Sequence, residues 1–144
     1  MLLATYGTFR KGQKLSDYLE HLREHGSSEV MEITGLKLFV VGMAPGAKIT
    51  NNPNDKAVIE LIEADISDEE IQDTLEVLDR VEGVAYGLYE RNSIDTPRGK
   101  ALIYTKCGDM NECVKITDWM EWQKKGEAEK RKAMSKAGEL AIYV

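Results

Sequence analysis

Stretches with the pattern of β-strands run through most of this chain, and helical stretches are inserted between them one at a time. Apolar, β-branched and aromatic residues favour strands over 2–9, 30–43, 56–66, 84–94, 100–106 and 139–144. Helices are expected over 16–25, from 67 to about 80 and from 117 to about 136. A doubly wound parallel sheet would alternate strand and helix more strictly. The order therefore predicts an α+β fold with a mixed sheet or partly closed barrel and helices outside it.

The clearest local signal is a capping box that begins the second helix. Ser67 is expected at the N-cap and Glu70 three residues later, where each side chain satisfies a backbone donor of the other. Residues 96–99 predict the turn of a hairpin that joins two strands. Gly35 predicts a break or a bulge within residues 30–43, and the turn-rich stretch 44–55 predicts a long exposed loop.

Composition limits the classes of protein to which the chain can belong. Its 144 residues suit one domain, 1–144, with 42% hydrophobic and 31% charged residues. The net charge of −6 argues against non-specific binding to nucleic acid or to anionic membranes. Cys107 and Cys113 are too few for a disulfide framework, and the N-terminus lacks the pattern of a signal peptide. We therefore expect a cytoplasmic protein.

The first candidate site is the end of the first strand. It comprises four residues that precede a basic, glycine-containing turn: Tyr6, Gly7, Thr8 and Phe9. The missing Cβ of Gly7 permits close approach of a ligand to the backbone, and free N–H groups with the Thr8 hydroxyl suit a carboxylate or phosphate. Arg10 and Lys11 would add positive charge, and Lys14 also lies beside the loop, where an anionic group would arrive. The alternative is an ordinary strand end followed by a polar turn.

The second candidate is Glu82, which follows the end of a helix and is flanked by Val81, Gly83 and Val84. Burying an unpaired carboxylate is expensive, so a glutamate among apolar neighbours is unusual. If Glu82 is buried, its pKa should rise and make it a usable acid or base near neutral pH. The alternative is that Glu82 completes the helix and points to water.

Taken in order along the chain, these segments resemble a known family. The matching segments are residues 6–9, 11–13, 45–46, 78–83, 87–91 and 99–104. They resemble the γ-glutamylcyclotransferase-like family, which includes γ-glutamylaminecyclotransferases and AIG2-like proteins, through its YG(S/T)L loop and its LDxxEG segment followed by YxR. The resemblance extends from residue 2 to about 105. It departs from the pattern at Phe9, where the family usually has Leu, and it fades after residue 106.

The resemblance implies a small mixed β-barrel with helices packed around it. It also implies an enzyme that uses no cofactor and no metal, in which the α-amine of a small γ-glutamyl substrate attacks its own γ-amide. The products are 5-oxoproline and an amine or amino acid. The family's catalytic glutamate falls on Glu82, and its substrate loop falls on Tyr6, Gly7, Thr8 and Phe9. Neither the leaving group nor the oligomeric state follows from the sequence.

Two alternatives belong to other classes of protein. One is a non-catalytic module that binds a small anionic ligand in the same pocket, since a fold does not determine function. The other is a nucleic-acid-associated protein that uses Trp119, Trp122 and the basic run at 124–132. The net charge speaks against the second, and we expect neither a nucleic acid nor a membrane as partner. The two tryptophans are expected to pack in the core, and His21 and His25 to be solvated rather than to bind metal.

Overall fold

The structure is a computed structural model that describes residues 1–142. Its elements are listed here in chain order: β1 (Leu2–Thr5), η1 (Ser16–Leu19), α1 (Glu20–Glu24), β2 (Gly26–Thr34), β3 (Leu36–Val41), β4 (Ala44–Ile49), β5 (Lys56–Ala64), α2 (Asp68–Val81), η2 (Val84–Tyr86), β6 (Tyr89–Thr96), β7 (Gly99–Lys106), β8 (Val114–Ile116), α3 (Trp119–Gln123) and α4 (Glu127–Ile142). Here η denotes a 3₁₀ helix. None of the helices in this part of the chain is long and apolar enough to cross a membrane.

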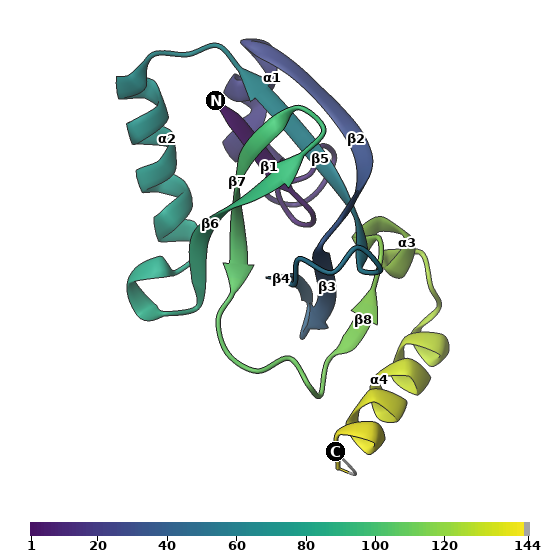
Figure 1. The fold of residues 1–144 in the computed structure, drawn as a ribbon. Coiled ribbons are helices and arrows are strands. Elements are labelled where there is room, and N and C mark those ends of the chain that lie inside the picture. Colours follow the sequence, from purple (N-terminus) through teal and green to yellow (C-terminus); the bar gives the residue numbers. More distant parts are fainter. Residues whose placement is uncertain (143–144) are drawn as a thin grey trace.

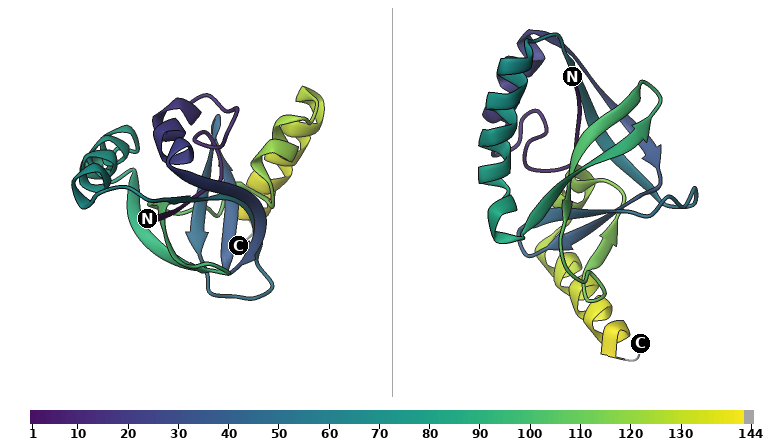
Figure 2. Two further views of the ribbon diagram at one scale, coloured as in Figure 1. Left: turned by 90° about the horizontal axis from the view of Figure 1, so that it is seen from above. Right: turned by 60° about the vertical axis from the view of Figure 1, so that its left-hand side comes forward.

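The strands form two sheets rather than one closed barrel. The larger sheet has the order β2-β5-β1-β7-β6, and only its β1–β7 pair is parallel. The smaller sheet has the order β4-β3-β8 and is antiparallel. The mixed α+β fold with helices outside the strands is thus confirmed. Figures 1 and 2 show α2 and α4 on opposite sides of the strands.

The central strands of the larger sheet, β1, β5 and β7, pack on both faces, which explains why apolar residues of these strands face both ways. On β5, Ile59 and Leu61 join the core shared with the smaller sheet. Ile62 on the same strand faces the other way and packs with Leu19, Leu22 and with Leu78 of α2. The second face therefore joins the sheet to α1 and α2, and the loop after β1 lies in this layer.

Several local predictions are confirmed. The side chain of Ser67 accepts a hydrogen bond from the Glu70 N–H, and α2 runs for 14 residues from this cap. β6 and β7 pair as the expected hairpin, from Tyr89↔Lys106 to Thr96↔Gly99. Gly35 separates β2 from β3 with a φ of +80°, a conformation that favours glycine.

The region expected to be an exposed loop, 44–55, is half strand. Ala44–Ile49 forms β4, and the turn residues that suggested a loop are accommodated because β4 lies at the edge of the smaller sheet. An edge strand tolerates Pro45, whose nitrogen cannot donate to a neighbouring strand. Gly46 fits beside Lys106 of β7, where a Cβ would approach the Lys106 Cβ to 2.9 Å.

Other boundaries also differ from those predicted. The first strand ends at Thr5 rather than residue 9, and Ser16 begins a 3₁₀ turn with no side-chain cap. Residues 84–94 are not one strand, because Gly83 and Gly87 adopt left-handed conformations on either side of η2. The short β8 was not expected. The helical region after 117 is divided into α3 and α4, and α4 extends to Ile142, so the strand expected at 139–144 is wrong up to that residue. Residues 143 and 144 lie outside the described part.

Candidate active site

One cavity brings together both candidate sites, although they are more than 70 residues apart in the sequence. It has a volume of about 360 Å³ and lies between the loop after β1, the end of α2 and the first residues of β4 and β6. Tyr6, Gly7, Thr8, Phe9 and Glu82 all line it. The lining is otherwise mostly apolar, and Lys14 provides a positive charge.

The loop after β1 is held in a compact conformation by its own backbone. The Arg10 N–H donates to the Gly7 carbonyl at 2.9 Å, and the Leu15 N–H donates to the Thr8 carbonyl at 2.8 Å. A Cβ at Gly7 would overlap the ring of Pro45, so only glycine allows this contact between the loop and β4. Within residues 1–142, the N–H groups of Gly7, Thr8 and Phe9 donate to no other protein group. Such free donors beside a cavity suit a carboxylate or a developing oxyanion.

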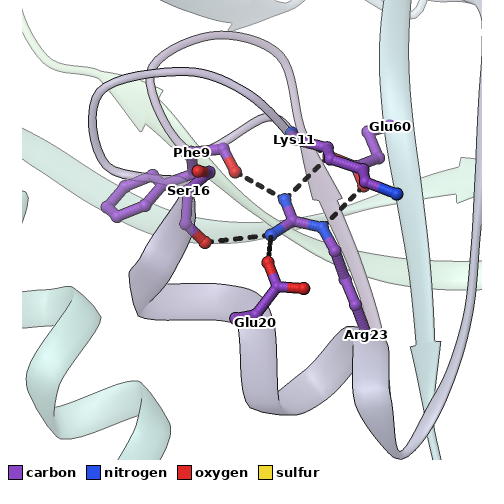
Figure 3. A network of polar contacts seen from close by, with 6 residues as sticks. All are labelled: Phe9, Lys11, Ser16, Glu20, Arg23 and Glu60. Atoms are coloured by element: carbon purple, nitrogen blue, oxygen red, sulfur yellow. Dashed lines mark hydrogen bonds and ion pairs between the residues drawn. The ribbon is translucent and has the colours of Figure 1, made fainter.

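A buried ion pair fixes the outer side of this loop (Figure 3). Arg23 of α1 contacts both carboxylate oxygens of Glu60 on β5, at 2.8 and 2.9 Å. The same guanidinium donates to the Phe9 carbonyl at 2.7 Å and to the Ser16 carbonyl at 2.9 Å. Glu60 also accepts from the Lys11 N–H at 2.8 Å. These bonds connect the loop to α1 and to the sheet, so the loop is preorganised rather than free to move.

The contacts of Glu60 with Arg23 and Lys11 also keep Glu60 charged. Burial alone would raise the pKa of Glu60, but the hydrogen bonds from Arg23 and Lys11 outweigh it and lower that pKa. Glu60 therefore stays ionised and paired at neutral pH. No feature of the sequence near Glu60 singled it out, because its partners come from other parts of the chain.

Of the three basic residues expected beside the loop, Lys14 lines the cavity, whereas Arg10 and Lys11 do not. Arg10 is buried and pairs with Asp118 at 2.8 Å, which connects the loop to the first turn of α3. Lys11 is exposed and does not line the cavity, and only its backbone N–H is engaged, by Glu60. Lys14 is the basic side chain in the lining, so a charged ligand would meet Lys14 rather than Arg10 or Lys11.

Glu82 lies at the C-cap of α2, and the chain turns at once through Gly83, whose φ is +67°. Its side chain is half-buried and lines the cavity, rather than pointing into open water. Burial raises the pKa of Glu82 to about 7, although the positive charge of Lys106 acts in the opposite direction. A carboxyl group with this pKa can both accept and return a proton near neutral pH.

Three tyrosines surround the site, and the sequence did not indicate the part played by two of them. The Tyr6 hydroxyl donates to the Tyr104 carbonyl at 2.6 Å, and the Tyr104 hydroxyl donates to Asp79 at 2.6 Å. The Tyr89 hydroxyl donates to the Pro45 carbonyl at 3.0 Å. Burial and the charge of Glu82 raise the pKa of Tyr89 to about 12, so this hydroxyl remains a donor. Tyr89 and Tyr104 lie in the matching segments 87–91 and 99–104, but only the fold places them in the cavity wall.

The histidine and tryptophan residues considered in the sequence make contacts within the fold rather than with the cavity. His21 bonds through Nε2 to the Thr74 hydroxyl at 2.9 Å, and thus joins α1 to α2. Trp119 and Trp122 are buried against Val40, as expected, and are not exposed for stacking on bases. In the part of the chain that the structure describes, no three His, Cys, Asp or Glu side chains are grouped as metal ligands.

Comparisons with known proteins support the fold. No protein-family model and no curated protein matches the chain. Among solved structures, it is similar to uncharacterized protein PH0828 from Pyrococcus horikoshii, at 25% identity and a TM-score of 0.59 over 85% of this chain and 92% of that one. It is also similar to YtfP from Escherichia coli, at 25% identity and a TM-score of 0.58 over 86% of this chain and 100% of that one.

A third similar structure is c4763, described as specific to uropathogenic E. coli, at 17% identity and a TM-score of 0.61 over 85% of this chain and 94% of that one. At this identity the likeness concerns the fold alone. These neighbours have the γ-glutamylcyclotransferase-like fold, and the fold of this chain matches theirs. A fold of this kind is compatible with an enzyme.

Proposed function

We propose that the protein is a γ-glutamyl cyclotransferase with Glu82 as its general acid and base. The observation that carries the proposal is the presence of a half-buried carboxyl group, with a pKa raised to about 7, in the same cavity as the loop of Tyr6, Gly7, Thr8 and Phe9. In this reaction the substrate carries its own nucleophile. The protein therefore needs to fold the substrate, transfer protons from the α-amine and stabilise one oxyanion.

The proposed reaction begins with a protonated α-amine, which cannot attack until it loses a proton. Glu82 as carboxylate accepts this proton, and the amine nitrogen then bonds to the γ-carbonyl carbon. The free N–H groups of residues 7–9 bind the substrate carboxylate or the oxyanion of the tetrahedral intermediate. Glu82 returns the proton to the amide nitrogen as its bond to carbon breaks. The ring nitrogen gives up its second proton to the Glu82 carboxylate, which passes it to water or to the released amine. The products are 5-oxoproline and a free amine or amino acid.

The proposal needs neither a cofactor nor a metal. The buried pair of Arg23 and Glu60 supports the loop from behind, and the tyrosine hydroxyls fix the opposite wall. In this proposal the substrate is a small γ-glutamyl compound in the cytoplasm, and neither nucleic acid nor membrane is a partner.

The test is to incubate the protein with a panel of γ-glutamyl amines and γ-glutamyl amino acids and to follow 5-oxoproline by NMR. We expect turnover of at least one member, and a fall of about 100-fold or more in Glu82→Gln. Glu76→Gln is the matched control, because Glu76 is an exposed glutamate on the same helix. Equal turnover by the wild type and Glu82→Gln would exclude the role given to Glu82.

The second candidate is a non-catalytic module that binds a γ-glutamyl-like anion in the same cavity. It is favoured by the free N–H groups of residues 7–9, which suit binding without reaction. Binding of panel members without any 5-oxoproline, and with the same affinity in Glu82→Gln, would select this alternative over the enzyme.

A further inference from the structure

A second cavity lies on the smaller sheet and shares no lining residue with the first. It has a volume of about 720 Å³, and its walls come from β3, β4, β8, the loop at 108–113 and one face of α4. Figure 1 shows α4 near β8 and away from α2. We call this cavity the lysine cleft, after Lys37, Lys48, Lys115 and Lys136, which line it.

The charge of the lysine cleft is opposite to that of the whole chain. Four lysines line it, whereas Asp109 is the acidic residue in its described lining. The Asp109 carboxylate is already engaged, because it accepts from both the backbone and the side-chain nitrogen of Asn111 at 2.9 Å. An excess of positive charge in a chain with a net charge of −6 attracts anions to this one place.

The lysines are also close enough to disfavour one another. Lys37 on β3 lies directly opposite Lys48 on β4 in the antiparallel register, a position where like charges are destabilising. Lys115 lies on β8, on the other side of β3 from β4, and the neighbouring Lys37 ammonium lowers its pKa. The carboxylate nearest to Lys37 is that of Asp55, at 3.8 Å. Among the side chains that the structure describes, no ion pair joins Lys48 or Lys115 to an acidic residue. A bound anion would relieve this repulsion.

The inner surface of the cleft is apolar, which limits the kind of anion that fits. Phe39 lies on the same face of β3 as Lys37. In the antiparallel register Phe39 lies opposite Lys115 of β8. Met110, Val114, Ala133 and Ala137 contribute further apolar lining. A fully polar polyanion would leave this surface unused, whereas an apolar ligand without charge would leave the lysines unpaired.

We propose that the lysine cleft binds a small amphiphilic anion, in which a phosphate or carboxylate group is attached to an aromatic or aliphatic body. The anionic group contacts Lys37, Lys48 and Lys115, and the apolar body packs on Phe39. Lys136 of α4 closes the site from the opposite side. This site is separate from the proposed cyclotransferase cavity, and neither proposal depends on the other.

The test is an NMR titration of the ¹⁵N-labelled full chain with phenyl phosphate as the probe. We expect saturable shifts of amide signals in β3, β4 and β8, with little change at residues 6–9. Inorganic phosphate, which has the charge alone, and benzyl alcohol, which has the ring alone, should each bind about tenfold or more weakly. The variants Lys48→Gln and Lys115→Gln should each weaken phenyl phosphate about fivefold. Lys100→Gln is the control, because Lys100 is exposed on β7 and pairs with Asp95.

The Lys48→Gln variant also tests whether a loss of affinity comes from misfolding. Lys48→Gln removes a like charge opposite Lys37, so its thermal midpoint should equal or exceed that of the wild type while its affinity falls. The proposal would be overturned by no saturable shifts, by shifts confined to residues 6–9 and 82, or by equal affinity for inorganic and phenyl phosphate. Unchanged affinity in both cleft variants would do the same.

Discussion

Replacing Glu82 with Gln should change how the stability of the protein depends on pH. Burial raises the pKa of Glu82 from an ordinary value of 4.5 to about 7. Below pH 4.5 the carboxyl is protonated in both the folded and unfolded states, so its burial does not make the free energy of unfolding depend on pH. Between pH 4.5 and about 7 the unfolded state ionises Glu82 in water, whereas the folded state keeps it protonated, so rising pH favours the unfolded state until the folded state also ionises. Stability is therefore lost between pH 4.5 and about 7.5, by roughly 2–3 kcal/mol from this group alone.

The loss should be absent in Glu82→Gln, because the amide does not titrate. We expect the free energy of unfolding of the variant, relative to the wild type, to increase by roughly 2–3 kcal/mol between pH 4.5 and pH 8. Urea titrations at several pH values measure this, with fluorescence of the buried Trp119 and Trp122 as the probe. All other groups titrate alike in both proteins, so the difference isolates Glu82.

Parallel stability curves for the two proteins across this range would refute the argument. They would mean that the folded state does not desolvate the Glu82 carboxylate, and the physical basis for its role as a base near neutral pH would be lost. A difference that decreases with increasing pH would be equally damaging, because it would mean that the folded state favours the ionised form.

Three further substitutions test how the site is supported. Gly7→Ala should destabilise the fold by about 1–3 kcal/mol in urea unfolding, because the new Cβ overlaps the ring of Pro45, and it should also abolish binding in the cavity; a stable variant that still binds would show that this contact is not required. Glu60→Gln should cost about 3 kcal/mol in the same assay, because it leaves the buried Arg23 guanidinium with only the exposed carboxylate of Glu20, at 3.5 Å. Glu63→Gln at an exposed position of the same strand should cost less than about 1 kcal/mol, and equal costs would contradict the role of the buried pair. Ser67→Ala should lower stability by about 1 kcal/mol by removing the N-cap of α2, and an unchanged thermal midpoint would show that the cap contributes nothing.

The parts of the candidate site that the sequence indicated are those whose signal is local. Glu82 stood out because its neighbours are apolar, and Gly7 because it ends a strand before a basic turn. Both residues line the same cavity in the structure. Tyr89 and Glu60 were missed as contributors because their roles depend on contacts with Pro45 and Arg23, which lie 44 and 37 residues away.

The difference between local signals and long-range contacts also explains which parts of the fold were predicted wrongly. The Ser67 cap and the hairpin after Thr96 were predicted because their hydrogen bonds lie within a few residues. Residues 44–49 have the composition of a loop and become a strand only because they pair with β3 at the edge of the smaller sheet. Arg10 was expected beside a ligand, yet it is buried on Asp118, which is 108 residues away.

The order of strand-like and helical stretches determined the class of this fold, because the period of apolar residues decides which segments become strands and which become helices. The sequence also determined the start of α2 and the two segments that line the first cavity. Only the tertiary structure decided that the strands form two sheets, that Glu82 is desolvated, and that Lys37, Lys48 and Lys115 gather on one face. Desolvation and repulsion between charges depend on distances through space, and residues far apart in the chain set those distances only once it has folded.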